Sequence, residues 1–438
     1  MKKLSAYLYG LSLAIFGYLF FKQGYYIFKS AIDLPILDDW EAVGPERIPE
    51  HLNWEWLLAP HNEHRILFTR LQAYILYNIN FWDVRVHIQL NYVIYGFICA
   101  LILWQIFKST KNFYEAALVT LFANGLNSQF IAGNHLWAYQ SHFHFVLLFP
   151  ILGIQLLFAR KDSTALFFFG VLCLAACSFS FSTGVVSSFV LTLASMTDVL
   201  FKLKFRNLNI RVGIVRLFIL SAVMIPCFYF HIINHAVNIY HAAPVSPFYF
   251  LFWDYFFNIY SLGFGYAEIS SLLGFICFTP ILFLFFLNFK KTFADRGSIQ
   301  NTLLLLNILI FIGVIAYGRG NFPIASSHSY RYCEFSAQIA ALSALLILRL
   351  PKNILKFSAL LILFVAFLIG TQDAWLYRKN YKRIFDQRTE NLKCINDYIH
   401  QRRFDATCPG LYPGDLKDHI EIAREMNVSF IQKALKKP

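Results

Sequence analysis

Charged residues are scarce in this sequence: Asp, Glu, Lys and Arg together make up 14% of its 438 residues. A soluble domain normally carries about a quarter of such residues. A soluble chain of this length would also need many polar stretches to cover its surface, and few are present. The composition therefore excludes a set of ordinary soluble domains.

Metal-binding cysteine pairs are also missing. None of the eight cysteines stands in a Cys-x-x-Cys spacing, which excludes the common zinc and redox motifs. Most of them lie in or beside apolar runs, whereas Cys394 and Cys408 lie in the polar C-terminal tail. If that tail lies in an oxidising compartment, these two thiols are expected to form a disulfide.

Long apolar runs dominate the chain instead. Runs of about 16–22 residues recur from end to end, which is the length of a helix that crosses a bilayer core. The first run, 4–21, follows Lys2 and Lys3 and precedes no small-residue cleavage site, so it is predicted to be an uncleaved helix with its N-terminus inside. The further spans expected are 88–107, 113–131, 143–158, 164–181, 184–201, 212–233, 269–287, 300–317, 336–350 and 356–373.

The sequence thus predicts an all-α, polytopic membrane protein with about eleven transmembrane helices. The stretch 66–81 is apolar but interrupted by Arg, Gln and Asn, which favours an interfacial helix next to the first outer loop. Residues 246–265, rich in Phe and Tyr, are a second candidate for an interfacial helix. We expect a transmembrane domain over 1–373 and a small soluble tail over 374–438.

The formal net charge is +13, which in a soluble protein would suggest a nucleic-acid partner. In a membrane protein, Lys and Arg gather in cytoplasmic loops and set the orientation. Basic residues recur in the connections that a cytoplasmic N-terminus places inside, and the opposing connections near 132–142 and 182–183 contain none. The C-terminus is therefore expected outside, together with the loops 22–65, 234–268 and 318–335.

Two adjacent carboxylates, Asp38 and Asp39, lie in the first outer loop beside Trp40 and Glu41. Like charges in contact repel, so the pKa of one carboxyl group is expected to rise toward the range of a general base. The alternatives are a divalent-cation site and a solvated turn.

The segment His61-Asn62-Glu63-His64-Arg65 follows in the same loop. If it is helical, His61, His64 and Arg65 share one face. The spacing differs from the His-Glu-x-x-His metal motif and no third ligand is near, so no metal site is predicted here. We interpret this segment, including Glu63, as a polar wall that faces an anionic substrate group; the alternative is the start of an interfacial helix.

The last outer loop brings Arg319 and Arg331 to the mouth of the bundle, with His328 and Tyr330 close to Arg331. Arginine binds phosphate oxygens with a fork of N–H donors, and an arginine near lipid needs a partner. A lipid-linked phosphate is the predicted partner, and the alternative is that these side chains snorkel to lipid headgroups. Three histidines at another outer helix end are interpreted as packed interfacial residues: His135, His142 and His144.

In their order and sidedness these features resemble the GT-C glycosyltransferases, integral membrane enzymes that use polyprenyl-phosphate sugars. The stretch 39–42, Asp-Trp-Glu-Ala, looks like the Asp-Tyr-Glu-Ala of the dolichyl-phosphate-glucose glucosyltransferases. The pair at 38–39 is similar to the acidic pair of the protein O-mannosyltransferases. The runs 61–65 and 329–332 resemble those of bacterial O-antigen or lipopolysaccharide glucosyltransferases.

This resemblance implies an inverting hexosyltransferase of the bacterial inner membrane with a periplasmic active site. It would move a sugar from a polyprenyl-phosphate donor to a glycan or lipid-linked acceptor. Asp39 would be the catalytic base with Asp38 as its neighbour, and Arg331, with Arg319, would hold the donor phosphate. A carboxylate takes the hydroxyl proton and arginine stabilises the leaving phosphate, so no cofactor is expected; a divalent cation at the acidic pair stays open. The lack of a glycine-rich phosphate loop argues against a nucleotide-sugar donor.

Two other classes stay open at this point. An O-antigen polymerase or ligase also works on lipid-linked sugars, but it usually carries its large outer loop late in the chain, whereas the acidic loop comes first here. A membrane transporter would favour ionisable residues at mid-membrane and broken helices. The predicted spans are nearly free of carboxylates, which counts against ion coupling.

Overall fold

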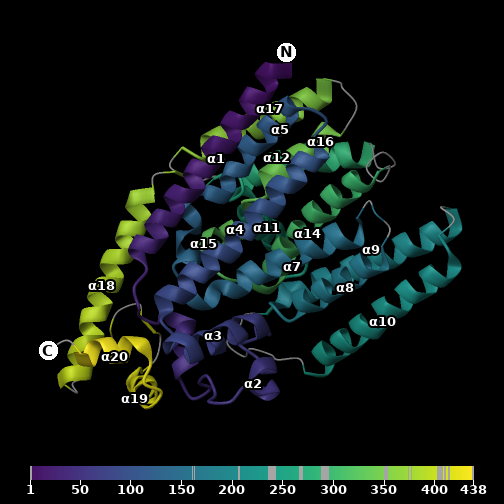
Figure 1. Ribbon diagram of the computed structural model, residues 1–438. Helices are drawn as coiled ribbons and strands as arrows, with labels where there is room; N and C mark the ends of the chain where they lie inside the picture. The colour runs from purple at the N-terminus through teal and green to yellow at the C-terminus, as the bar shows by residue number, and fades with distance from the viewer. Residues whose placement is uncertain are drawn as a thin grey trace.

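The computed structural model describes residues 2–159, 161, 163–205, 208–234, 243–265, 270–287, 295–349, 354–372, 374–375, 377–401, 408, 411–412 and 415–436. Over these ranges the regular elements are helices, and an isolated bridge pairs His61 with His64. The protein is an all-α, polytopic membrane protein (Figure 1).

The bundle is formed by long and medium helices. They are α1 (Lys2–Ser30), α4 (Val84–Ser109), α5 (Phe113–Ala123), α7 (Ser141–Leu157), α8 (Thr164–Ser178), α9 (Ser182–Phe205), α10 (Ile210–Ile233), α11 (Phe250–Ser261), α12 (Ser270–Leu287), α14 (Arg296–Arg319), α15 (Tyr330–Ser336), α16 (Ile339–Leu348) and α17 (Ile354–Gly370).

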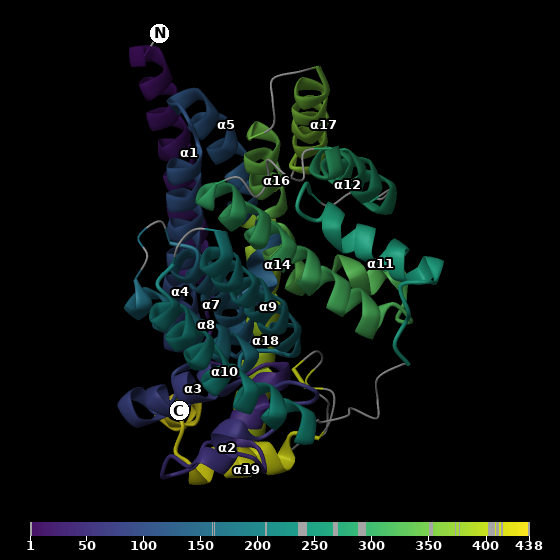
Figure 2. The same ribbon diagram turned by 90° about the vertical axis from the view of Figure 1, so that its right-hand side faces the viewer.

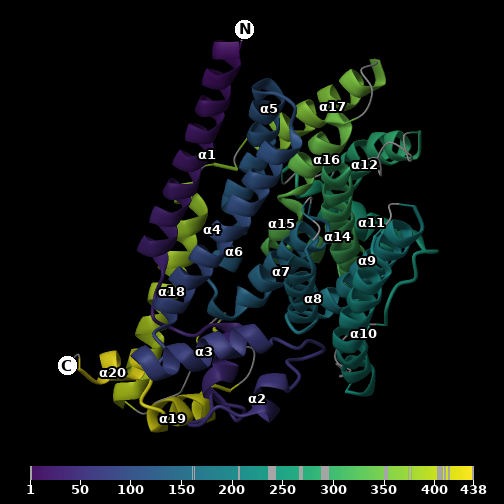
Figure 3. The same ribbon diagram turned by 45° about the vertical axis from the view of Figure 1, so that its right-hand side comes forward.

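Shorter elements and the C-terminal helices complete the fold. They are η1 (Leu37–Val43), α2 (Trp54–Leu58), α3 (Leu67–Asn80), η2 (Asn124–Asn127), η3 (Gln129–Ile131), α6 (Ala132–His135), η4 (Ala138–Gln140), η5 (Ile324–His328), α18 (Tyr377–Gln401), α19 (Lys417–Glu425) and α20 (Ser429–Lys436). Figure 3 shows α2, α3, α19 and α20 gathered at the end of the molecule opposite the N-terminus.

Within the described ranges, eight helices are long and apolar enough to cross a membrane. Two shorter apolar helices, α8 and α17, coincide with two further predicted spans. The predicted span 113–131 is interrupted, because α5 gives way to the 3-10 turns η2 and η3. There the Asn124 side chain donates to the carbonyls of Thr120 and Leu121 and competes with helix continuation. The exact count of about eleven is therefore not confirmed.

The outward faces of the helices are apolar, which fits lipid and not water. Tyr7 and Phe21 of α1 are 74% and 75% exposed, and Ile232 of α10 is 75% exposed. In contrast, α16 packs in the interior and all ten of its residues are buried. Contact with hydrocarbon costs these apolar side chains no free energy, whereas contact with water would be unfavourable.

Basic residues at two helix ends contact polar residues of neighbouring helices. Lys108 Nζ lies 2.9 Å from Gln300 Oε1, joining the end of α4 to the start of α14. Arg296 of α14 lies 3.0 Å from Asp198 of α9. The N-terminus and the C-terminal helices lie at opposite ends of the molecule (Figures 1 and 2). The orientation across the membrane stays a prediction.

A fusion of alkaline phosphatase to the C-terminus tests that orientation. We expect an active phosphatase, because a cytoplasmic N-terminus places the opposite end of the molecule, with the tail, outside. The same site fused to green fluorescent protein should be dark. A fluorescent fusion paired with an inactive phosphatase would reverse the orientation and move the outer loops inside.

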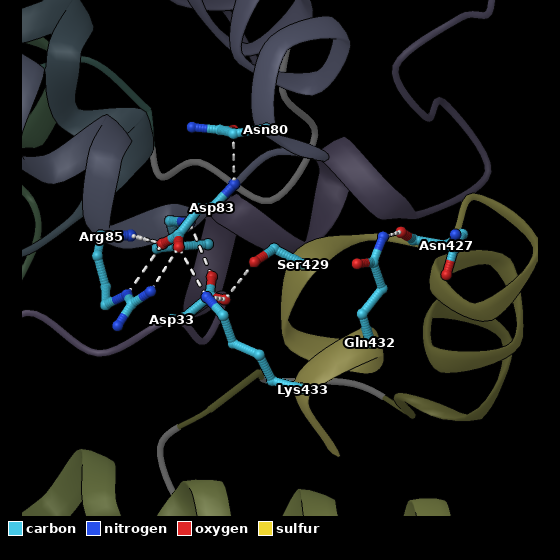
Figure 4. A network of polar contacts seen from close by, with 9 residues as sticks. Asp33, Asn80, Asp83, Arg85, Asn427, Ser429, Gln432 and Lys433 are labelled. Carbon is cyan, nitrogen blue, oxygen red and sulfur yellow. Dashed lines mark hydrogen bonds and ion pairs between the residues drawn. The ribbon is translucent and has the colours of Figure 1, made fainter. Parts of the chain in front are cut away.

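The C-terminal tail is tied to the first outer loop by a polar network (Figure 4). Asp33 Oδ2 accepts hydrogen bonds from Ser429 Oγ at 2.7 Å and from Lys433 Nζ at 2.6 Å. Lys433 also lies 2.7 Å from Asp83 Oδ2, which Arg85 contacts at 2.6 Å. Burial raises the pKa of Asp83, but the hydrogen bonds from Arg85 and Lys433 outweigh this effect and lower the pKa to about 2. Charged groups therefore join α20 to Asp33 after α1 and to Asp83 at the start of α4.

The predicted disulfide between Cys394 and Cys408 is confirmed, with Cα atoms 6.0 Å apart and a sequence separation of 14. It ties α18 to the segment whose Leu411 carbonyl accepts a hydrogen bond from the Leu37 N–H at 2.7 Å. Trp40 is fully buried, with its ring 5.7 Å from the ring of Phe430 in α20. The tail thus forms part of the wall around η1.

Replacing both bridged cysteines by serine should lower the free energy of unfolding by roughly 3 kcal/mol, since the bridge closes a short loop of the unfolded chain. Thermal unfolding of the purified protein measures this loss. Cys173→Ser, at a free cysteine of α8, is the matched control and should change little. Unchanged melting of the double variant, with or without reductant, would show that the bridge does not hold the tail.

Candidate active site

The acidic turn η1 is shaped by local backbone conformation. Leu37 has a φ of 46°, a left-handed backbone conformation that residues other than glycine rarely adopt. Such strain persists only where surrounding contacts hold it, here the hydrogen bond to Leu411 and the packing of Trp40. The turn directs the two neighbouring carboxylates, Asp38 and Asp39, to different surroundings.

A cavity of about 800 Å³, lined by several charged side chains, lies between the loop after α1 and the adjoining ends of α9, α14 and α15. It brings together charged residues that the sequence analysis singled out in two distant segments. These residues are Asp38, His61, Glu63, His64, Arg319 and Arg331. We call this space the polar cavity.

Asp38 lies on the polar cavity beside a buried imidazole. His61 Nε2 lies 3.8 Å from Asp38 Oδ2, and His61 Nδ1 lies 2.6 Å from Glu41 Oε2. Burial lowers the pKa of His61, but the two carboxylates raise it more, to about 9. Burial raises the pKa of Asp38, while His61 and Arg331 lower it to a net value below the ordinary one. At neutral pH the site therefore holds an ionised Asp38 next to a protonated His61.

Asp39 is fully buried and does not line the polar cavity. Its two oxygens accept hydrogen bonds from the backbone N–H of Tyr139 at 2.7 Å and of Ile36 at 3.2 Å. Burial raises the pKa of Asp39 to about 7, although these hydrogen bonds oppose the rise. The expected elevation of one carboxyl pKa is present, but burial is its largest cause, ahead of the neighbouring charge. The sequence favoured Asp39 as the base, whereas Asp38 is the carboxylate of the pair that lines the cavity.

The segment 61–65 is a tight turn, not the helix considered from its spacing. His61 and His64 exchange backbone hydrogen bonds of 2.8 and 2.9 Å, and Asn62 has a φ of 53°. His61, Glu63 and His64 line the polar cavity as expected. Arg65 does not, because its guanidinium donates to the carbonyls of Leu58 and Asn234. Arg65 therefore holds neighbouring loops together.

The two candidate arginines, Arg319 at the end of α14 and Arg331 in α15, differ in their surroundings. Arg319 Nη2 lies 3.4 Å from Glu63 Oε1, which also lies 3.3 Å from His64 Nε2. The Arg331 guanidinium is 4.6 Å from the Trp137 ring centroid, a cation–π contact. Among the described residues, no carboxylate lies within ion-pair distance of Arg331. Arg331 is thus the better placed of the two to bind an anion.

His328 and Tyr330 do not join this group. His328 Nε2 lies 2.9 Å from Asn258 Oδ1, and the side chain lines a different cavity. The structure describes the backbone of Tyr330, where α15 begins, but its side chain lies outside the described part. Tyr332 lines the polar cavity instead.

Sequence reasoning missed three residues near the site. Glu41, read as a neighbour of the acidic pair, binds His61, and His142, read as packing, lines the polar cavity. Glu334 was assigned to an outer loop but is fully buried, 3.5 Å from His144 and 3.0 Å from Asn134. A carboxylate three positions after Arg331 at a span end was the available signal for Glu334.

A metal ion, if one binds, fits a different group from the predicted acidic pair. Asp38, Glu41 and His61 each offer a ligand atom, and these atoms lie within 4.8 Å of one another. Carboxylate oxygens and an imidazole suit several divalent cations. A proton on His61 competes with such an ion, and the expectation of no cofactor stays untested.

An apolar groove of about 460 Å³ lies next to the polar cavity between α9 and α10. The two spaces share Glu63, Phe181, Ser182 and Val186 in their linings. Most of the groove is formed by apolar side chains such as Phe189 of α9. The charged cavity and the apolar groove are therefore neighbours.

Comparisons with known proteins give a distant structural likeness. No protein-family model matches the chain, and no curated protein matches it. The chain is similar to crystal structures of ArnT from Cupriavidus metallidurans, bound to undecaprenyl phosphate (TM-score 0.40) and in the apo state (TM-score 0.43). Each match has 12% identity and covers 97% of this chain and 76% of the other. A likeness this distant carries no argument about chemistry.

Proposed function

We propose that this protein is an inverting glycosyltransferase of the GT-C type in the bacterial inner membrane. It transfers a hexose from a polyprenyl-phosphate donor to a glycan or lipid-linked acceptor of the O-antigen or lipopolysaccharide kind. The reaction takes place in the polar cavity, on the periplasmic face.

One observation supports this proposal above the others: the polar cavity with its arginines lies directly beside the apolar groove, and the two share four lining residues. A polyprenyl phosphate joins a charged head to a long hydrocarbon chain. Arg331 suits the phosphate because a guanidinium offers several N–H donors, and the groove suits the first isoprene units. A soluble nucleotide sugar would have no use for the groove.

The chemistry follows from the charges around Asp38. Its carboxylate accepts the proton of the acceptor hydroxyl as the oxygen attacks the anomeric carbon from the face opposite the phosphate. The new glycosidic bond forms as the bond from the anomeric carbon to the phosphate oxygen breaks, so the configuration inverts. Arg331 stabilises the negative charge that builds up on the leaving polyprenyl phosphate. His61 and Arg331 together keep Asp38 ionised at neutral pH.

The test uses purified protein in nanodiscs with polyprenyl-phosphate hexoses that carry a radiolabelled sugar, and lipopolysaccharide extracts as acceptors. We expect label in the acceptor and an inverted anomeric linkage by NMR. A diphosphate-linked oligosaccharide tests the polymerase or ligase alternative in the same assay. Transfer from that donor alone, with none from any monophosphate-linked hexose, would overturn the proposal.

A further inference from the structure

A second cavity of about 500 Å³ lies on the other side of the acidic turn, against α18. Ile36 and Leu37 line this cavity, whereas the adjacent residue Asp38 lines the polar cavity. Likewise Cys333 lines the second cavity and Arg331 the first. The start of η1 and α15 therefore stand as a thin wall between the two spaces. We call the second space the α18 cavity.

The lining of the α18 cavity is cationic and rich in hydrogen-bond donors. Arg383 and Arg388 belong to it, and among the described residues that line it there is no Asp or Glu. Side-chain amides supply further donors and acceptors: Gln129, Asn380, Gln387 and Asn391. Burial lowers the pKa of His328, which therefore adds no charge at neutral pH. Guanidinium and amide groups in this combination suit a phosphoryl group with a sugar beside it.

Arg388 is a buried residue in the lining of this cavity. Its side chain is 5% exposed, and its charge lowers the pKa of Asp39 behind the acidic turn. Arg383, one and a half helical turns earlier, is exposed and borders the same cavity. One arginine is thus fixed inside the wall, and the other is accessible at the opening.

The depth of the α18 cavity matches the lipid headgroup region. Tyr381, next to the lining residues of α18, stacks on Tyr26 near the end of α1, with ring centroids 5.9 Å apart. The same end of α1 carries Lys22 and Lys29, each over a tyrosine ring at 5.7 Å. Tyrosines and lysines at the end of a transmembrane helix mark the membrane–water interface. Figure 3 shows α18 running beside α1 at this level.

We propose that the α18 cavity binds the phosphoryl group and adjoining sugar of a phosphorylated membrane glycolipid, which serves as the acceptor. The assignment as acceptor rests on the proposed function, whereas phosphoryl binding does not. Because η1 and α15 separate the two cavities, a glycolipid held by its phosphate in the α18 cavity has to extend its outer sugars around this wall to reach Asp38. Two separate anion sites then hold the two lipid substrates apart.

Binding is tested with the full-length protein in phosphatidylcholine nanodiscs that contain phosphatidic acid as a lipid phosphomonoester. Native mass spectrometry measures retained phosphatidic acid. Arg383→Gln should weaken its binding about tenfold, the usual effect of losing one charge-assisted hydrogen bond. Lys382→Gln, which removes the same charge from the exposed side of α18 outside the cavity, is the matched control and should bind like the wild type.

Inorganic phosphate separates the two sources of a phosphoryl group. At millimolar concentration it should displace phosphatidic acid from the wild type, which shows shared chemistry. Equal retention by the wild type and Arg383→Gln would overturn the site. Binding of inorganic phosphate without any binding of phosphatidic acid would overturn the lipid source.

The enzyme assay gives an independent readout of the acceptor role. Arg383→Gln should raise KM for the phosphorylated acceptor about tenfold and leave KM for the donor unchanged. Unchanged acceptor KM would overturn the acceptor role. A wild type that transfers no sugar at all would end the proposed function, while the nanodisc comparison would still decide whether the α18 cavity binds phosphate.

Discussion

Asp38→Asn is expected to lower the rate of sugar transfer by about 10²–10⁴-fold while the protein still folds, inserts and binds its lipid donor. The substitution keeps the shape of the side chain and removes its basicity. Asp38 is the carboxylate of the adjacent pair that lines the polar cavity, and the positive charges of His61 and Arg331 keep it ionised. Turnover with labelled donor measures the loss, and donor binding is measured separately.

Asp39→Asn is the matched control, since it removes the neighbouring carboxylate. Asp39 accepts two backbone hydrogen bonds, and an amide can accept only through its oxygen, so this variant should lose stability more than turnover. The folded-state pKa of Asp39, about 7, is higher than that of an unfolded chain. Its contribution to stability is therefore present at low pH and is lost as pH rises toward 7. Normal turnover in Asp38→Asn together with collapse in Asp39→Asn would return the role of base to Asp39.

The pH profile and a chelator refine the assignment of Asp38. Transfer should persist as pH rises from neutral toward about 9, because Asp38 stays ionised over this range and His61 keeps its proton up to its pKa of about 9. If Asp38, Glu41 and His61 hold a required cation, EDTA abolishes transfer and one divalent ion restores it. Full activity in EDTA leaves Asp38 acting as a base without metal.

Arg331→Ala should raise KM for the polyprenyl-phosphate donor by about 10–100-fold, the effect of removing charge-assisted hydrogen bonds to a phosphate. Arg331→Lys should restore only part of this affinity, because lysine keeps the charge but lacks the planar fork of donors and stacks less well on Trp137. Donor titrations of both variants give KM and turnover separately.

Arg211→Ala is the control for this pair, since Arg211 is an exposed arginine at the start of α10. It should leave the donor KM unchanged. Arg319→Ala should have a smaller effect than Arg331→Ala, because Glu63 already contacts the Arg319 guanidinium. If both Arg331 variants show the donor KM and turnover of the wild type, the phosphate binds elsewhere.

Much of the fold could be predicted because it depends on local composition. An apolar run of sufficient length must become a helix in lipid, since each backbone polar group needs a partner within the segment. The runs that became α1, α4 and α9 were predicted for this reason. The span predicted over 113–131 is interrupted, because Asn124 ends the helix through side-chain hydrogen bonds to the carbonyls of Thr120 and Leu121. The length of an apolar run does not reveal such bonds.

The candidate site was predicted in its members more than in its geometry. Asp38, His61 and Arg331 do meet in one cavity, as their common outer side suggested. The separation of Asp38 from Asp39 was not predictable, because it depends on the Tyr139 N–H, one hundred positions away. The helix considered for residues 61–64 is a turn in the structure, and residue spacing alone could not predict the backbone hydrogen bonds between His61 and His64.

By itself, the sequence determined the class of protein, because hydrophobic length and scarce charge leave few alternatives to a polytopic helical membrane protein. From the charge pattern it also predicted which polar segments share the side opposite the basic loops. Only the tertiary structure decided which carboxylate faces the cavity and that the tail walls in η1 and borders a second, cationic cavity. These outcomes depend on contacts between distant segments, and composition and spacing record no such contacts.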